Sequence, residues 1–258
     1  MTALLDAGLG LFGQAAVLGF VVFLRIGAAM ALVPGFGATM VPVRVKLSLA
    51  LAFTAIVAPA VSAAVAPHTA TAEALLTCLA TETLIGLTLG LVLRLMVLAL
   101  EIAGTIAAQS TSLSQMFGAG GEPMPAISHL LVMAGLALAM MAGLHVRIAG
   151  VFMLSYDALP PGSFPGAAIV RVWSVGHIAH AFAIAFGLAA PFVLASTIYN
   201  VALGAINRAM PQLMVSFVGA PALTLGALLL LALTVPPALA LWLGALDMLL
   251  ADPFGAPR

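Results

Sequence analysis

Charged residues are scarce in this sequence. Lys and Arg together number 8, Asp and Glu also number 8, and only 6% of the 258 residues are charged, whereas 64% are hydrophobic. Soluble domains contain about 25% charged residues, so this composition argues against a soluble globular protein. It indicates an integral membrane protein or a buried part of a membrane assembly. The net charge of zero also argues against a nucleic-acid-binding protein, which needs a basic surface.

Cysteines and catalytic motifs are also lacking. The single cysteine, Cys78, excludes an internal disulfide, and without a Cys/His cluster we expect no structural zinc site. No G-x-S-x-G, H-E-x-x-H or glycine-rich phosphate loop occurs. His177 and His180 could place two ring nitrogens on one face, but no third ligand accompanies them, so a packed or interfacial pair is preferred. The sequence therefore predicts a protein that is not an enzyme and has no catalytic residue, metal or cofactor.

Long apolar runs make up most of the chain. Crossing a bilayer core takes about 20 apolar residues in a helix. Six blocks reach that length, at about residues 9–33, 47–66, 74–108, 126–156, 168–205 and 213–250. The opening MTALLDAGLG lacks the basic residues that begin a cleaved signal peptide, so we expect the first block to remain as a spanning helix. The predicted fold class is all-α, a polytopic membrane protein forming a single membrane domain over residues 1–258.

Three of these blocks are too long for a simple crossing. At about 1.5 Å per residue, residues 74–108 would form a helix near 50 Å long, beyond the roughly 30 Å of a bilayer core. The last two blocks are as long and contain four prolines, Pro191, Pro221, Pro236 and Pro237. Because proline removes a backbone donor and clashes with the preceding turn, we expect kinks or re-entrant hairpins there. Long, kinked helical hairpins packed on other protein are therefore preferred to six simple spans.

Basic residues between the blocks bear on orientation. If the spans alternate, Arg44, Lys46 and Arg208 fall on one side of the membrane and Arg171 on the other. Because Lys and Arg accumulate in cytoplasmic loops, this distribution favours a cytoplasmic first loop and an outward amino terminus.

Several ionisable residues lie deep inside apolar blocks, among them Arg25, Glu82, Arg94, Glu101, His145 and Arg147. A charge at mid-bilayer costs about 2.5–3.5 kcal/mol on insertion scales, so it normally faces a partner or a cavity. One interpretation is pairing with other helices, which would set their register. The other is a wetted path along the face shared by Arg94 and Glu101, ending near Gln109. A proton relay is disfavoured because the two acids, Glu82 and Glu101, are offset around the helix and no D-x-x-E-like cluster occurs.

The third block also carries a packing motif. Gly86 and Gly90 form a G-x-x-x-G pattern, and such small residues let another helix approach closely. The pattern is common, so it predicts packing rather than a specific function.

A polar segment, QSTSLSQMFGAGGEPMP, interrupts the apolar sequence at residues 109–125. Its glycines allow the backbone to rearrange at low strain, and methionine adapts to irregular shapes. From the residues alone, an ordinary turn between helices is the preferred interpretation. The residues that would instead form a gate loop are Gln109, Ser110, Ser112, Ser114, Gln115, Met116, Phe117, Gly118, Gly120 and Gly121.

Four stretches, in order along the chain, carry a more specific pattern. Residues 23–52 contain Arg-Ile-Gly, Pro-x-Phe-Gly and Val-Pro-x-Arg-x-Lys, and residues 81–109 contain Glu-x-Leu-Ile-Gly-x-x-x-Gly. Residues 141–162 contain Gly-x-His and a Pro-Gly turn. Residues 206–231 contain Asn-Arg-x-x-Pro-Gln, at Asn207, Arg208, Pro211 and Gln212. Together they resemble the FliR/SctT family, the R subunit of the type III secretion export gate, and the flagellar branch is preferred to the virulence branch.

This resemblance implies a non-enzymatic gate subunit built like fused P-like and Q-like helical hairpins. The implied partners are FliP-like and FliQ-like subunits, an FlhB-like switch subunit, the basal-body ring and the unfolded flagellar proteins that pass through the pore. The implied location is the bacterial inner membrane, within the flagellar basal body.

The resemblance also makes residues 109–125 a pore plug rather than a turn, with Met116 and Phe117 sealing the pore. Two positions depart from the family pattern, because Thr111 replaces a glycine and Met214 an asparagine. The alternative function is a secondary transporter of a small solute, using Arg94, Glu101 and His145. It would need internal repeats with broken helices, and no convincing repeat is present.

Overall fold

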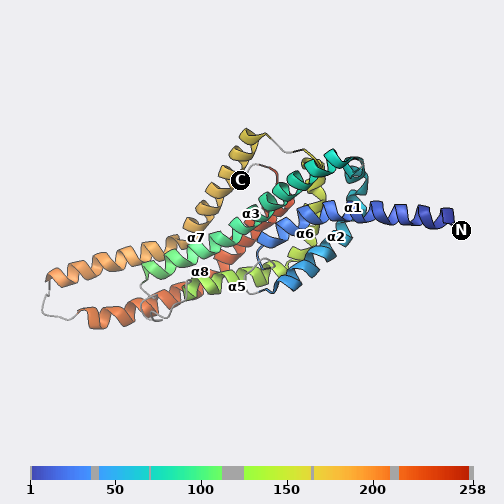
Figure 1. Cartoon of the computed structure of the whole chain (residues 1–258). Coiled ribbons are helices and arrows are strands. Elements are labelled where there is room, and N and C mark those ends of the chain that lie inside the picture. The colour runs from blue at the N-terminus through green and yellow to red at the C-terminus, as the bar shows by residue number, and fades with distance from the viewer. Residues whose placement is uncertain are drawn as a thin grey trace. The chain divides into compact units, whose positions relative to one another are not determined.

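The computed structural model describes residues 2–35, 41–69, 71–111, 125–163, 166–209 and 215–255. These segments form α-helices and one short 3₁₀-helix, and no strand occurs in these ranges (Figure 1). The elements are α1 (Thr2–Leu32), α2 (Val43–Val65), η1 (Ala66–Thr69), α3 (Ala72–Ser110), α5 (Ala126–Met141), α6 (Leu144–Ala158), α7 (Ala167–Ala209) and α8 (Val215–Ala251). The predicted all-α fold class is confirmed.

Five of the helices are long and apolar enough to cross a membrane, namely α1, α2, α3, α7 and α8. The pair α5 and α6 meets the same criterion only when taken together, which gives up to six spans. Each of the six predicted blocks corresponds to one of these elements or to this pair. The chain is therefore a multi-pass membrane protein.

The internal prolines do not break the helices that contain them. Pro191 lies inside α7, and α8 runs without interruption from Val215 to Ala251. Of the two expected alternatives, re-entrant hairpins at these prolines are therefore wrong, whereas kinked helices are not contradicted. Within a bilayer every backbone group has to be satisfied internally, so a helix that loses one hydrogen bond at proline still satisfies more groups than a reversal of the chain would.

The real break lies elsewhere, between α5 and α6. Gly143 has a φ of 82°, in the left-handed region that side chains other than glycine rarely adopt. The expected block at residues 126–156 is thus two helices.

The chain forms two compact units. The first, unit 1, contains Met1–Leu95, Ala142–His177 and Leu249–Pro257, and the second, unit 2, contains Met96–Met141 and Ile178–Met248. Helices α3, α7 and α8 therefore each contribute residues to both units. Whether the two units act as one export-gate domain stays a prediction.

Unit 1 is built where α1 packs closely on α3. A Cβ atom at Gly90 would lie 2.5 Å from the carbonyl oxygen of Ala29, and one at Gly86 would collide with the carbonyl oxygen of Arg25. Only glycine permits this approach of two helix backbones, so the packing predicted from the G-x-x-x-G pattern is confirmed. Helix α2 packs on α1 and on α6, where Phe53 meets Phe152 edge-on with ring centroids 6.0 Å apart.

Unit 2 uses the same principle between α3 and α5. A Cβ atom at Gly104 would collide with the backbone of Ser128, and the Ser128 hydroxyl donates to the carbonyl oxygen of Glu101 at 2.8 Å. From α8, the buried Trp242 donates its indole N–H to the carbonyl oxygen of Met96 at 2.7 Å. This side chain ties α8 to α3.

Candidate functional site: a buried ion pair and the start of the polar segment

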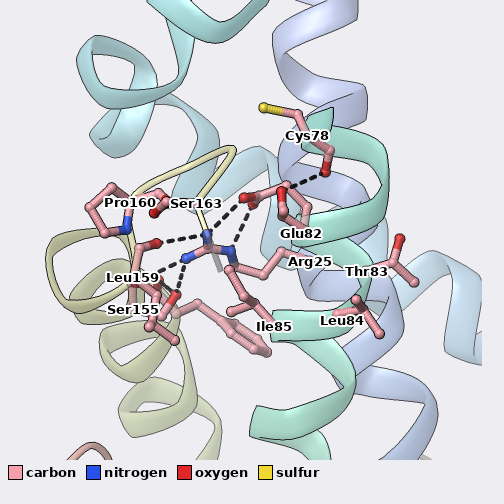
Figure 2. A network of polar contacts seen from close by, with 12 residues as sticks. Arg25, Cys78, Glu82, Thr83, Leu84, Ile85, Ser155, Leu159, Pro160 and Ser163 are labelled. Atoms are coloured by element: carbon pink, nitrogen blue, oxygen red, sulfur yellow. Dashed lines mark hydrogen bonds and ion pairs between the residues drawn. The ribbon is translucent and has the colours of Figure 1, made fainter. Parts of the chain in front are cut away.

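A polar cluster in unit 1 surrounds Arg25, two turns before the carboxyl end of α1. Figure 2 shows its guanidinium between Glu82 of α3 and the carboxyl end of α6. Nε donates to one oxygen of Glu82 at 2.7 Å and Nη2 donates to the other at 2.8 Å. Nη1 donates to the carbonyl and hydroxyl oxygens of Ser155 at 2.9 and 3.0 Å, and Nη2 also donates to the carbonyl oxygen of Leu159 at 2.9 Å.

These contacts use all five N–H donors of the guanidinium. Both charged side chains are 0% exposed, and a buried ion pair is tolerated only when its geometry is good and its remaining donors are satisfied. The two-point contact between arginine and carboxylate meets that condition. The Tyr156 ring lies 3.8 Å from the guanidinium carbon and covers its face, which adds a cation–π contact.

The same guanidinium completes the carboxyl end of α6. The last carbonyl groups of a helix have no partner within the helix, and a basic side chain can satisfy them. Here Leu159 supplies such a carbonyl, whereas the carbonyl of Ser155 accepts from Arg25 in addition to the backbone N–H of Leu159, and the chain then turns at Gly162, which has a φ of 70°. Arg25 therefore joins three helices, α1, α3 and α6, at one point.

Arg25 of α1 and Glu82 of α3 are thus paired between helices. Because both carboxylate oxygens of Glu82 accept from Arg25, the pair holds helices together and offers no free group for proton transfer. The other charges predicted with this pair lie elsewhere. Arg94, His145 and Arg147 are exposed and Glu101 is half-buried, and a wetted path along Arg94 and Glu101 stays a prediction.

The polar segment is described at residues 109–111 and at its last residue, Pro125. Helix α3 continues to Ser110, whose hydroxyl donates to the carbonyl oxygen of Ala107 at 2.9 Å, while Gln109 is exposed. The buried Thr111 donates to the same carbonyl at 2.8 Å. The rest of the predicted gate loop lies outside the described residues: Ser112, Ser114, Gln115, Met116, Phe117, Gly118, Gly120 and Gly121.

Two further predictions concern α7. Asn207 and Arg208 belong to its last turn and Arg208 is exposed, whereas Pro211 and Gln212 lie outside the described residues. His177 is buried and meets Trp173 edge-on at 4.8 Å between ring centroids, as expected for a packed histidine. In the part of the chain that the structure describes, no group of three or more His, Cys, Asp or Glu could hold a metal ion.

The comparison with known protein families decides the assignment. The family of bacterial export proteins, family 1, matches residues 16–249. The chain belongs to this family. The match includes residues of both compact units and most of each candidate span.

Individual relatives are similar to this chain over most of their length. The chain is 34% identical over 226 residues to the flagellar biosynthetic protein FliR of Caulobacter vibrioides, covering 86% of this chain and 89% of the relative. It is 30% identical to that of Escherichia coli K12, covering 81% of each, and 29% identical to that of Aquifex aeolicus, covering 83% of each. The predicted FliR/SctT resemblance is therefore confirmed.

Proposed function

We infer that this chain is a structural, non-enzymatic subunit of the bacterial flagellar export gate. The observation that carries this inference is the export-family match over residues 16–249, together with relatives named as flagellar biosynthetic proteins along most of their length. The described fold suits such a role, because long apolar helices are held together by backbone contacts and one buried ion pair.

Deleting the gene tests this inference directly. In its own bacterium, the deletion should abolish swimming and the secretion of flagellar subunits, and a plasmid copy should restore both. A strain that lacks the chain and still exports flagellar subunits at the normal rate would contradict the inference.

The proposed partners are FliP-like and FliQ-like subunits, an FlhB-like subunit and the basal-body ring, with unfolded flagellar proteins as cargo. The outer faces of α7 and α8 support the need for protein partners. Within the apolar stretches that could span a membrane, only 28% of α7 and 17% of α8 is buried inside the chain. With 43 residues at about 1.5 Å each, α7 is roughly 65 Å long, so a bilayer core of about 30 Å cannot cover it.

Purification in mild detergent together with the neighbouring gene products tests these partners. We expect a stable complex with two small helical membrane proteins, each present in several copies. A chain that purifies alone under conditions in which those two proteins form their own complex would contradict the partnership. Recovery of that complex in the inner-membrane fraction tests the proposed location.

We further propose that residues 109–125 plug the pore. The support is their polar and glycine-rich sequence directly after α3, combined with Met116 and Phe117, which are apolar enough to exclude water. Deleting residues 112–121 should leave the complex assembled and raise ion leak through it, and Met116→Ser with Phe117→Ser should raise leak with the length unchanged. Normal ion conductance in both variants would contradict the plug.

A further inference from the structure

One side of helix α3 in unit 1 is lined by exposed leucines. Leu84, Leu87 and Leu91 are 49%, 39% and 44% exposed, whereas Ile85 and Leu89 are buried on the opposite side of the helix. The exposed leucines follow one another at steps of three and four residues. Such alternating steps place side chains in one row along a helix, and this row is the seam along which a second helix packs.

Arg94 occupies the next position of this row, three residues after Leu91. Its side chain is exposed, and among the described residues no hydrogen bond or ion pair engages its guanidinium. The nearest acids of α3 do not change this, because Glu82 is bonded to Arg25 and Glu101 lies seven residues away. At the helical rise, this separation corresponds to about 10 Å. The row therefore combines apolar side chains with one unneutralised cation.

The position of Arg94 along α3 is costly for a charge. The apolar stretch that could cross a membrane runs from Glu73 to Ser110, and Arg94 lies about 32 Å from the first of these residues and about 24 Å from the last at the helical rise. Residues 83–93 and 95–100 contain no charged residue and no histidine. A charge in such surroundings normally faces an opposite charge or a cavity. The described part of this chain supplies no opposite charge to Arg94, so a neighbouring molecule has to supply it.

We propose that this row, defined by Leu84, Leu87, Leu91 and Arg94, docks a helix of a neighbouring membrane subunit that carries an Asp or Glu within its own apolar face. The proposal rests on the proposed function, because it requires that the chain assembles with other membrane proteins. Apolar side chains of the partner helix pack between the three leucines, and its carboxylate accepts two parallel hydrogen bonds from the guanidinium.

The chemistry of the row favours a protein helix over lipid. Acyl chains can cover the three leucines, but they offer no acceptor to a guanidinium. The anionic headgroups of a lipid lie at the membrane surface, outside the hydrocarbon core, whereas Arg94 lies far from both ends of the apolar stretch. A helix with an intramembrane carboxylate satisfies both parts of the row.

Copurification of the assembled complex tests the role of the charge. A tag on this chain recovers the complex in mild detergent, and mass spectrometry gives the amount of every other subunit per chain. Arg94→Leu and Arg94→Glu should lower the recovery of one subunit about tenfold or more, because its carboxylate is left buried without a cation or meets a second carboxylate. Arg94→Lys should keep most of the recovery, since it keeps the charge. Arg171→Glu is the matched control, because it reverses another exposed arginine, and it should leave the recovery unchanged.

The stability of the purified chain separates docking from folding. Because no described residue of this chain binds the guanidinium of Arg94, Arg94→Leu should leave the free energy of unfolding of the chain alone unchanged. Unfolding in detergent, followed by tryptophan fluorescence, measures it. A clear loss of stability would contradict the proposal, because Arg94 would then have its partner within this chain.

Photo-crosslinking identifies the partner. Leu87 or Leu91 is replaced by p-benzoylphenylalanine in the otherwise unchanged chain, and the complex is irradiated in native membranes. We expect a crosslink to one membrane subunit, at an apolar segment that contains Asp or Glu. Adding Arg94→Glu should lower the yield of this crosslink about tenfold or more.

Three further results would overturn the docking face while the complex still forms. One is an Arg94→Glu chain that loses no more of any subunit than Arg171→Glu does, and another is crosslinking to lipid alone. The third is a crosslinked protein segment without an acidic residue. Failure of the proposed function gives a different pattern, because the unchanged chain then purifies alone and the deletion strain still exports flagellar subunits. That pattern would contradict the docking face as well.

Discussion

Replacing Arg25 by leucine would leave the Glu82 carboxylate buried without its cation. Glu82 would lose hydrogen bonds of 2.7 and 2.8 Å at a position that is 0% exposed. Leu159 would lose the donor to its carbonyl oxygen, whereas the carbonyl of Ser155 would keep the backbone N–H of Leu159 at 2.9 Å. Removing one partner of a buried ion pair costs about 3–5 kcal/mol, so we expect a loss of that size in the free energy of unfolding.

The double variant, Arg25→Leu with Glu82→Leu, separates charge from packing. It leaves no buried charge, and leucine fills much of the space of each original side chain. The remaining cost is mainly the unsatisfied carbonyl of Leu159, about 1–3 kcal/mol. The second substitution should therefore restore about 2 kcal/mol to the Arg25→Leu chain.

Unfolding by sodium dodecyl sulfate in mixed micelles, followed by tryptophan fluorescence, gives the free energy of unfolding of Arg25→Leu, of Glu82→Leu and of the double variant. Arg171→Leu is the control, because it removes an exposed arginine and should have little effect. If the double variant is less stable than Arg25→Leu by the full cost of Glu82→Leu alone, the two side chains act independently and the reasoning fails.

Two further predictions concern helix packing. Gly86→Ala places a Cβ atom against the carbonyl of Arg25 and should lower the free energy of unfolding by about 1–3 kcal/mol. Gly187→Ala is the control, because nothing lies within 4 Å of its new atom, and it should be neutral or slightly stabilising. The amount of each variant that accumulates in the membrane is compared, and equal amounts would contradict the close approach. Trp242→Phe loses the hydrogen bond to Met96 and should cost about 1–2 kcal/mol in the same detergent titration. Trp173→Phe is its control, because the indole nitrogen of Trp173 has no hydrogen-bond partner among the described residues, and an equal loss in both variants would contradict the role of the bond.

The helices were predictable because their signal is local. A run of about 20 apolar residues specifies a membrane helix wherever the rest of the chain lies, and the six blocks needed no tertiary information. The break at Gly143 was missed because glycine is common in membrane helices, so nothing in the sequence distinguishes this position from one inside a helix. Its left-handed φ of 82° is visible only in the structure.

The ion pair was harder to predict, because it depends on a contact between residues far apart in the sequence. Arg25 and Glu82 are 57 residues apart, and they meet because Gly86 and Gly90 bring α3 against the backbone of α1 in one register. The high cost of a lone intramembrane charge predicted that Arg25 needed a partner but did not say which. Combining an intramembrane arginine, an intramembrane glutamate and a neighbouring G-x-x-x-G pattern would have pointed to this pair.

The composition of unit 1 fixes when it can be completed during synthesis. Its two long stretches, up to Leu95 and from Ala142 to His177, are joined by Leu249–Pro257, whose residues Leu249 and Leu250 are buried. Phe254 also lines a pocket together with Ile85 of α3 and Trp173 of α7. The ribosome therefore has to translate beyond residue 249 before the amino-terminal unit can close, and a nonsense codon shortly before residue 249 would damage the part of the molecule that was made first.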